Sequence, residues 1–493
     1  MSEQKVTRLH PITLIINFVS QIKGFVIPAA VLLVSTFSSL TFDPNEKFFV
    51  KTLIYTGIMA LLVILFAVFS WIKWRKFVYW FEDGELRIEY GLFVKKKRYI
   101  PFERIQTLNY KESIFHRIFK LVRVEIETAG DSSGSSEGEL TAITREQAEQ
   151  IEIEMNKAKN KVIHSDDEDS EEVTIEKVPA KKSIYKMTNK ELILLASTSS
   201  SMGLLFASVF AIGSQFNDLI PYEQIYGEMQ NIIKFGVVFI IAIVLLLILF
   251  AWIVAVALAY IVNYNFKIEE LDDKIFISKG LLEKKSLTMP LYRIQGIRIV
   301  ENPIRQIFGY CRVVVDSAGG TGDEKEDTVV LLPFIKKKEA VKILQTLFPQ
   351  YIVEDKFVKV PRKSLFRYLM LPIYFLVIPI AAVSYFFYPY GLFSLIIVPI
   401  WMIMKFWQYK TAGFAMTDLQ LTIVYRFISK STVIISKNRI QAMTMKQSFF
   451  AERKDIATNK VNIMSGMTGF TAKTKHFAKE EQEKMLEWYK PNA

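Results

Sequence analysis

The 493-residue chain contains three copies of the tripeptide Arg-Ile-Gln. The residue types and spacing of these copies could support chemistry. An arginine guanidinium offers five N–H donors in a planar fork that suits a carboxylate or a phosphate, so the triplets could contact an anion or a partner protein. In a strand, Arg and Gln would instead lie opposite Ile and tie neighbouring strands together. Recurrence at one register favours this structural interpretation. The polar residues concerned are Arg104, Gln106, Arg293, Gln295, Arg439 and Gln441.

A shared salt bridge does not explain the recurrence of these arginines. Glu112 and Glu301 are candidate carboxylate partners for the first two copies, but Gln447 stands at the corresponding position of the third. The three arginines therefore need another common factor.

Basic residues form a second set of candidates, in two predicted hairpins that follow apolar segments. Near an anionic leaflet, each lysine or arginine contributes about 1 kcal/mol of attraction. A hairpin that lies generally against the membrane is favoured over a specific lipid site, because the third copy keeps only Arg426 and Lys430. The candidate anionic-lipid contacts are Lys95, Lys96, Lys97, Arg98, Lys284 and Lys285.

Motifs for catalysis or metal binding are missing from the sequence. There is no Gly-x4-Gly-Lys-[Ser/Thr], His-Glu-x2-His or Gly-x-Ser-x-Gly, and the four histidines are scattered. The single cysteine, Cys311, cannot form a disulfide within the chain and lies in an apolar strand pattern, which is typical of a small buried side chain. We expect no enzyme activity, no cofactor and no metal.

The triplets belong to a longer internal repeat. The first two copies align without a gap at an offset of 293 − 104 = 189, which places Gly91 on Gly280 and Pro101 on Pro290. The third copy lies at 439 − 104 = 335 and is degenerate, with Arg426 in place of the glycine and Ser436 in place of the proline. Terminal repeats are commonly atypical.

Apolar stretches precede each copy of the repeat. The chain is 51% hydrophobic with a mean hydropathy of +0.23. A bilayer core of about 30 Å requires about 20 apolar residues as a helix, and this predicts six membrane spans arranged as three pairs. The predicted spans are 24–42, 49–72, 191–213, 232–262, 367–387 and 391–408.

The net charge of +12 follows the positive-inside pattern and does not indicate nucleic-acid binding. The loop 214–230 has acidic residues and no lysine or arginine, whereas Lys73, Arg75 and Lys76 follow the second predicted span. We therefore expect a plasma-membrane protein with both termini and all three domains in the cytoplasm.

Each predicted cytoplasmic unit contains several short strands followed by one amphipathic helix. Alternation of polar and apolar residues at 85–90 and 123–128 predicts strands, and Ala148, Ile151 and Met155 lie at helical spacing. This order predicts a small β-sandwich or β-barrel capped by its C-terminal helix.

Two apolar spans, then strands carrying Gly-[Leu]-x5–8-Pro-x2-Arg-Ile-Gln, resemble the bacterial pleckstrin-homology-like (bacterial PH) family of membrane proteins, in particular its YdbT-like multi-pass members. The resemblance covers almost the whole chain and implies the PH fold for each cytoplasmic unit. The resulting division is a first transmembrane pair (1–74), PH-like domain 1 (75–162), an acidic linker (163–190), a second transmembrane pair (191–262), PH-like domain 2 (263–350), a third transmembrane pair (351–408) and a degenerate PH-like domain 3 (409–493).

The resemblance implies no enzymatic activity. We expect a scaffold or assembly factor that binds a membrane partner or the anionic membrane surface, in envelope maintenance or resistance to antimicrobial compounds. The expected partners are the bilayer and a shorter PH-like membrane protein or a second copy of the chain. A transporter or channel is the alternative, because Pro372 and Pro379 could break a membrane helix. The acidic run 165–172 fits a solvated linker better than a docking site for the basic hairpins, and the hydroxyl-rich 197–201 fits helix packing better than a polar conduit.

Overall fold

The computed structural model describes residues 6–19, 46–128, 138–164, 182–198, 242, 245–246, 248–318, 328–354, 356–369, 374–465 and 469–490. Several predicted features lie outside these residues: the span 24–42, the loop 214–230, the acidic run 165–172, and residues 199–201 of the hydroxyl-rich run.

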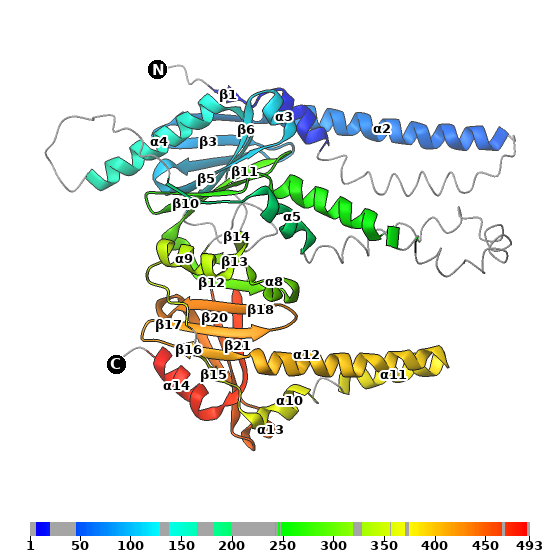
Figure 1. The fold of residues 1–493 in the computed structure, drawn as a ribbon. Coiled ribbons are helices and arrows are strands. Elements are labelled where there is room, and N and C mark those ends of the chain that lie inside the picture. The colour runs from blue at the N-terminus through cyan, green and yellow to red at the C-terminus, as the bar shows by residue number, and fades with distance from the viewer. Residues whose placement is uncertain are drawn as a thin grey trace. The chain divides into compact units, whose positions relative to one another are not determined.

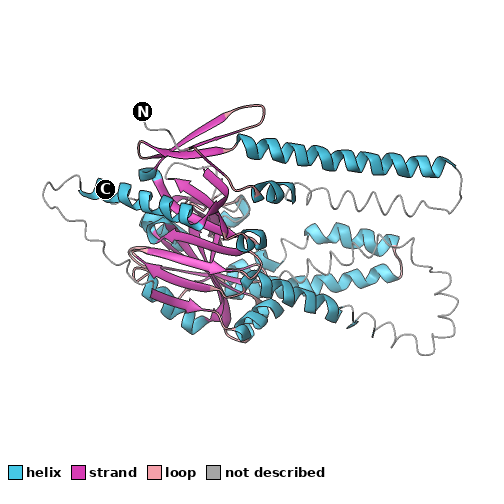
Figure 2. Cartoon of the chain, turned by 90° about the horizontal axis from the view of Figure 1, so that it is seen from above, coloured by secondary structure: helices cyan, strands magenta, loops and turns pink. Residues whose placement is uncertain are grey.

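The chain divides into two compact units, and Figure 1 labels the helices and strands along it. Unit 1 comprises Met1–Gly130, Ser136–Glu269 and Phe276–Thr288, and unit 2 comprises Asp131–Ser135, Glu270–Ile275 and Met289–Ala493. Figure 2 shows the described strands in magenta and the described helices in cyan.

The three repeats share one order of elements. Repeat 1 contains α2 (Glu46–Lys76), β2 (Val78–Glu82), β3 (Glu85–Tyr90), β4 (Lys96–Pro101), η1 (Phe102–Arg104), β5 (Ile105–Glu112), α3 (Ile114–Ile118), β6 (Leu121–Thr128), β7 (Gly138–Thr144) and α4 (Arg145–His164); β1 (Thr7–Arg8) pairs with β2.

Repeat 2 contains β8 (Lys182–Lys186), α5 (Asn189–Ser197), an apolar helix Ile248–Asn263, β9 (Lys267–Leu271), β10 (Lys274–Lys279), β11 (Lys284–Pro290), η3 (Leu291–Arg293), β12 (Ile294–Glu301), α8 (Pro303–Ile307), β13 (Tyr310–Ser317), β14 (Thr328–Lys336) and α9 (Lys337–Leu347).

Repeat 3 contains β15 (Val358–Lys359), η4 (Arg362–Ser364), α10 (Leu365–Leu369), α11 (Tyr374–Phe386), η5 (Tyr390–Ile396), α12 (Ile397–Thr411), β16 (Gly413–Met416), β17 (Gln420–Arg426), β18 (Lys430–Ser436), η6 (Lys437–Arg439), β19 (Ile440–Lys446), α13 (Phe449–Glu452), β20 (Ile456–Ile463), β21 (Phe470–Ala478) and α14 (Lys479–Tyr489).

The sheets run across repeat boundaries, so the prediction of one separate sandwich or barrel for each repeat is wrong. One seven-stranded sheet has the order β7-β6-β5-β11-β10-β9-β8, and a second has the order β14-β13-β12-β18-β17-β16-β15. The last strands of each repeat therefore pair with the first strands of the next, through β5·β11 and β12·β18. Strand pairing is non-local, and a period-2 pattern does not specify which edge a strand will meet.

Two smaller sheets end the series within the described residues. Strands β1-β2-β3-β4 form a four-stranded sheet that ends at β4, and β19-β20-β21 form a three-stranded sheet that ends at β19. The outer edges of β4 and β19, called the open edges below, thus have no partner strand among the residues described.

The cores follow the predicted alternation. In repeat 1, Leu86, Val124 and Ile126 are fully buried, and the predicted helical residues Ala148, Ile151 and Met155 pack with them. In repeat 3, Phe414 and Phe477 meet edge to face within the core. Burial of each such side chain contributes about 1.5–3 kcal/mol.

The prediction of six membrane spans is also wrong for the structure described. One described helix, Tyr390–Thr411, is long and apolar enough to cross a membrane, judged by length and composition. Within the described residues, the apolar helices Ile248–Asn263 and Leu376–Phe386 have 10–17 residues and do not meet the length of a candidate span. Pro379 lies inside α11. Hydropathy detects an apolar run but does not show that the run forms one helix of spanning length.

Candidate membrane-contact site at the hairpin tips

Each repeat has a hairpin whose tip is apolar and exposed. The three hairpin tips are residues 91–95, 280–284 and 426–430, and each joins two strands of the first half of its repeat. Phe93 is 88% exposed and Phe427 is 69% exposed, and Leu282 is exposed as well. Large apolar side chains at the point of a turn have no core to enter, so the tips can offer them to another apolar medium.

Backbone geometry explains the glycine that opens the first two tips. Gly91 and Gly280 have φ of +124° and +109°, and an added Cβ would lie 2.0 Å from the Val94 oxygen and 1.9 Å from the Glu283 oxygen. Only glycine fits such a turn. In the third tip the position is Arg426, whose guanidinium donates to the Ile428 oxygen at 3.1 Å and to the Thr411 hydroxyl at 3.1 Å.

Hydrogen bonds hold each tip at the end of the preceding apolar helix. The Lys76 ammonium at the end of α2 donates to the Leu92 oxygen at 2.7 Å. The Leu281 amide donates to the Ile261 oxygen at 2.9 Å. The Gln408 amide of α12 donates to the Phe427 oxygen at 2.9 Å. Each tip thus lies where an apolar helix meets the strands.

The predicted lipid-contact lysines lie at these tips and on the strands that leave them. Lys95 and Lys97 both pair with Glu89, at 2.6 and 2.8 Å. Their hydrogen bonds lower the pKa of Glu89. Lys96 is exposed, and the Arg98 guanidinium lies 5.8 Å from the centre of the Tyr90 ring.

In the second and third repeats the basic residues at the tips face a glutamate of the neighbouring strand. Lys284 pairs in register with Glu112, and Lys285 with Lys111. Lys430 lies 4.0 Å from Glu301, and burial lowers its pKa. Lys430 and Glu301 thus place opposite charges across the β12·β18 pairing.

A second set of exposed apolar residues lies on three short helices and was not predicted. The short helices α3, α8 and α13 follow the strand that begins at each triplet. Ile307 is 80% exposed and Phe450 is 70% exposed. The other exposed apolar residues of this set are Ile114, Phe115, Ile118, Phe119, Ile304, Phe308 and Phe449.

The short helix of one repeat contacts the tip of the next. The Arg117 guanidinium donates to the Leu281 oxygen at 2.7 Å. Ser429 donates to the Asn302 side chain at 2.6 Å, and Arg426 donates to the Gln306 side chain. The apolar pairs at 118–119, 307–308 and 449–450 are the sequence feature that could have indicated these exposed residues. Runs this short fit a buried turn equally well, so they do not predict exposure.

The three Arg-Ile-Gln triplets lie at the other end of these strands. In every copy Arg is the last residue of a 3-10 turn and Ile begins a strand. The strand register shifts immediately after each Ile, so Gln106, Gln295 and Gln441 each occupy a β-bulge. A bulge bends the strand and increases its twist, which gives the triplets a common conformational role.

The side chains of the triplets differ in their surroundings. Arg104 is exposed, Arg293 donates to the Ala318 oxygen at 2.9 Å, and Arg439 donates to the Tyr292 oxygen at 2.9 Å. Gln295 is buried and Gln441 is exposed. The structure does not bring the triplets together with the predicted basic residues at the tips.

Other candidate chemistry does not assemble in the described part of the chain. Burial raises the pKa of Cys311 to about 12, so its thiol stays protonated and unreactive near neutral pH. No group of three His, Cys, Asp or Glu side chains that could hold a metal occurs among the described residues.

Comparison with known proteins fits this threefold architecture. The bacterial PH domain family matches residues 25–159, 220–351 and 373–493. A Bacillus subtilis (strain 168) protein named UPF0699 transmembrane protein YdbT is 35% identical over 502 residues, which cover 99% of this chain and 98% of that protein. No solved structure matches the chain. Three family matches and one relative similar over nearly its whole length show that this chain belongs to the bacterial PH domain family.

Proposed function

We propose that this chain is a non-enzymatic, membrane-anchored scaffold whose hairpin tips contact an anionic bilayer surface. The observation that carries the proposal is one arrangement found in all three repeats. An exposed apolar tip is hydrogen-bonded at the end of an apolar helix, and basic residues lie on the adjoining strand.

The residues at the tips suit the interface between water and lipid. Moving a side chain such as Phe93 or Phe427 fully out of water contributes about 1.5–3 kcal/mol. Lysines and arginines next to it add about 1 kcal/mol each when the lipid is anionic. Contributions of this size support a reversible contact that orients domains already held at the membrane by an apolar helix.

The proposed location is the cytoplasmic face of the plasma membrane. The similar Bacillus subtilis protein is named a transmembrane protein, and the helix Tyr390–Thr411 is a candidate span here. Lys405 and Lys410 lie toward its C-terminal end, next to the strands of repeat 3. Basic residues mark the cytoplasmic end of a span, which supports cytoplasmic domains and termini.

The scaffold role rests on the open edges of β4 and β19. An exposed strand edge can pair with a strand of another chain. A second PH-like membrane protein or a second copy of this chain would supply such a strand, as repeats 2 and 3 do for repeats 1 and 2. We extend the proposal to assembly in envelope maintenance or resistance to antimicrobial compounds. Crosslinking in intact membranes tests the assembly, and recovery of the monomer alone would count against it.

The membrane contact is testable with an environment-sensitive dye on the full-length protein in lipid nanodiscs. A single cysteine replaces Phe93, Leu282 or Phe427 in turn, and buried Cys311 is replaced by serine. We expect dye emission to shift to the blue in nanodiscs with anionic lipid relative to zwitterionic lipid. Lys484→Cys is the control, because the Lys484 side chain is exposed on α14, and it should show emission typical of water in both lipids.

Charge reversal provides the second arm of this test. Lys96→Glu should reduce the anionic-lipid shift at position 93 without lowering the unfolding temperature, because Lys96 is exposed. Emission typical of water at all three tips, in either lipid, would disprove the proposed contact.

A further inference from the structure

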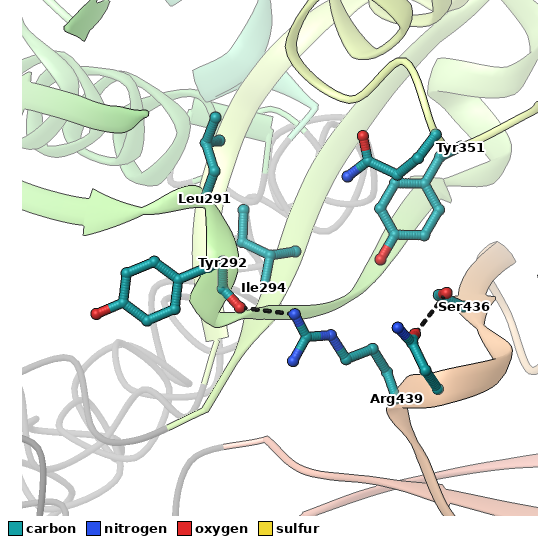
Figure 3. A pocket seen from close by; sticks show the side chains of 8 residues that line it. Leu291, Tyr292, Ile294, Tyr351, Ser436 and Arg439 are labelled. Carbon is teal, nitrogen blue, oxygen red and sulfur yellow. Dashed lines mark hydrogen bonds between the residues drawn. The ribbon is translucent and has the colours of Figure 1, made fainter. Parts of the chain in front are cut away.

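Unit 2 contains a pocket of about 190 Å³ at the end of the β12·β18 junction that carries the third Arg-Ile-Gln triplet (Figure 3). Its lining residues come from η3 and the start of β12, from the segment after α9, and from the end of β18 with η6. They are Leu291, Tyr292, Ile294, Gln350, Tyr351, Ser436, Asn438 and Arg439.

The polar groups of the pocket include one positive charge and no carboxylate. The Arg439 guanidinium donates to the Tyr292 oxygen at 2.9 Å, which uses one of its five N–H donors. The Ser436 hydroxyl donates to the Asn438 side-chain oxygen at 2.7 Å, and this orients the Asn438 NH2 as a donor. Such a set of donors favours an anion over a cation.

Tyr351 adds a hydroxyl close to this charge. Figure 3 shows its ring on the far side of the pocket with the hydroxyl directed toward Arg439. Burial raises the pKa of Tyr351, and the positive charge of Arg439 opposes that rise. The Tyr351 hydroxyl and the Arg439 guanidinium therefore both face the pocket.

The walls of the pocket are held in place by their own contacts. The Gln420 side chain accepts a hydrogen bond from the Ile352 amide at 2.8 Å and donates to the Ile352 oxygen at 2.6 Å. The ring of Tyr351 packs edge to face on Phe348, with centroids 6.1 Å apart. Donors fixed before binding lose little entropy when a ligand arrives.

The corresponding arginines have different surroundings. Arg293 is tied to Ala318 by its side chain and its backbone, and Arg104 is exposed. The third triplet has thus kept the shared fold position while its arginine faces a pocket. Arg104 therefore offers a matched control for any role specific to Arg439.

The position of the pocket separates it from the tip of the same repeat. Strand β18 runs from Lys430 beside the tip to Ser436 at the pocket, which is about 20 Å at 3.3 Å per residue. A lipid headgroup at the tip would not reach the pocket. Its volume is also below the roughly 300 Å³ typical of sites for drug-sized ligands.

From these observations we infer that the pocket binds a small, soluble phosphoryl compound, either inorganic phosphate or a compact phosphomonoester. The Arg439 guanidinium and the Asn438 amide hold the phosphoryl oxygens, the Tyr351 hydroxyl donates from the opposite wall, and Leu291 and Ile294 form the apolar floor. The site is independent of the membrane contact proposed for the tips.

Titration calorimetry on the full-length protein in detergent tests the inference, with inorganic phosphate and glycerol 3-phosphate as probes. We expect saturable binding of at least one probe. Arg439→Gln should weaken it by at least about 10-fold, the usual effect of losing a hydrogen bond to a charged group. Arg104→Gln should leave it unchanged. No binding of either probe, or equal binding by Arg439→Gln, would overturn the site.

Two further variants keep the test decisive if Arg439→Gln does not fold. Asn438→Ala and Tyr351→Phe each remove one proposed donor and should weaken binding by about 2–10-fold with unchanged unfolding temperatures. If both bind the probes as the parent does, the assignment fails even where Arg439→Gln is unstable.

A nanodisc arm distinguishes a soluble ligand from a lipid. Nanodiscs with phosphatidic acid should leave phosphate binding intact, and Arg439→Gln should leave the dye shift at position 427 intact. Loss of phosphate binding in these nanodiscs would assign the pocket to a lipid headgroup and overturn the soluble ligand.

Discussion

Strands β18 and β4 occupy the same position in repeats 3 and 1, at an offset of 430 − 95 = 335, but their surroundings differ. Four residues of β18, Thr432–Ile435, are buried between β12 and β17. In β4 the first four residues are exposed, and its described pairing is with β3 alone. The same strand is thus an internal joint in one repeat and an open edge in the other.

The residues of the two strands match these different roles. Apolar Val433 and Ile434 in β18 correspond to Arg98 and Tyr99 in β4. Basic side chains discourage unselected strand pairing at an exposed edge. The joints β5·β11 and β12·β18 hold the repeats together, whereas the basic side chains of β4 would oppose pairing with a positively charged strand.

Removing the counter-ion of a buried carboxylate next to the β12·β18 pairing should lower the stability of the fold the most. Asp316 is fully buried and pairs with Arg298 at 2.7 Å, and Ser465 donates to it at 2.8 Å. Arg298→Met would leave this carboxylate without its counter-ion and should lower the free energy of unfolding by about 3–5 kcal/mol. Denaturant unfolding of the full chain measures it.

The stability lost in the Arg298→Met variant should depend on pH. Burial raises the pKa of Asp316, and Arg298 opposes the rise. The fold thus favours the protonated carboxyl, and stability falls as the pH rises from about 4 through the folded-state pKa. Without Arg298 that pKa rises further, so the loss of stability should be larger at about pH 8 than at about pH 5. A loss independent of pH would contradict this assignment.

Matched truncations compare the joint with the open edge directly. Ile434 is fully buried and Tyr99 is 52% exposed, and the two correspond in the repeat. Ile434→Ala should cost about 2–5 kcal/mol of unfolding free energy. Tyr99→Ala should cost about 0.5 kcal/mol or less, as a surface change does. Equal losses from the two variants would mean that the β4 edge is covered.

A substitution at a hairpin tip should lower the stability of the fold less than these core changes. Gly280→Ala places a methyl group against the Glu283 oxygen at a φ that L-residues rarely adopt, and should cost about 1–3 kcal/mol. Gly309→Ala is the control. Its φ is also positive, at +70°, but an added Cβ meets nothing within 4 Å, so about 1 kcal/mol is expected. Thermal unfolding of the two variants should rank them in this order.

The repeat and its register could be predicted from sequence, because Gly91 and Pro101 recur at one offset together with the triplets. Alternation predicted strands such as β6, and helical spacing predicted α4. The joints could not be predicted from periodicity, which does not say which edges meet. Glu301 facing Lys430, and Glu112 facing Lys284, were the available clue.

The candidate site was predicted only in part. Charge located the lysines of the tips, but Phe93 and Phe427 lie in apolar runs too short to separate an exposed turn from a buried one. The pocket around Arg439 depends on Tyr351, which is 88 residues away in sequence (439 − 351 = 88). Only the fold brings such residues together.

Hydrogen exchange of β18 and β4 in the intact protein tests the central claim most directly. If repeats are joined by continuous sheets and the series ends at open edges, amides 431–435 should exchange only through global unfolding. Amides of 96–100 that point away from β3 should then exchange orders of magnitude faster. Equal, strong protection of both strands in the isolated protein would contradict the account.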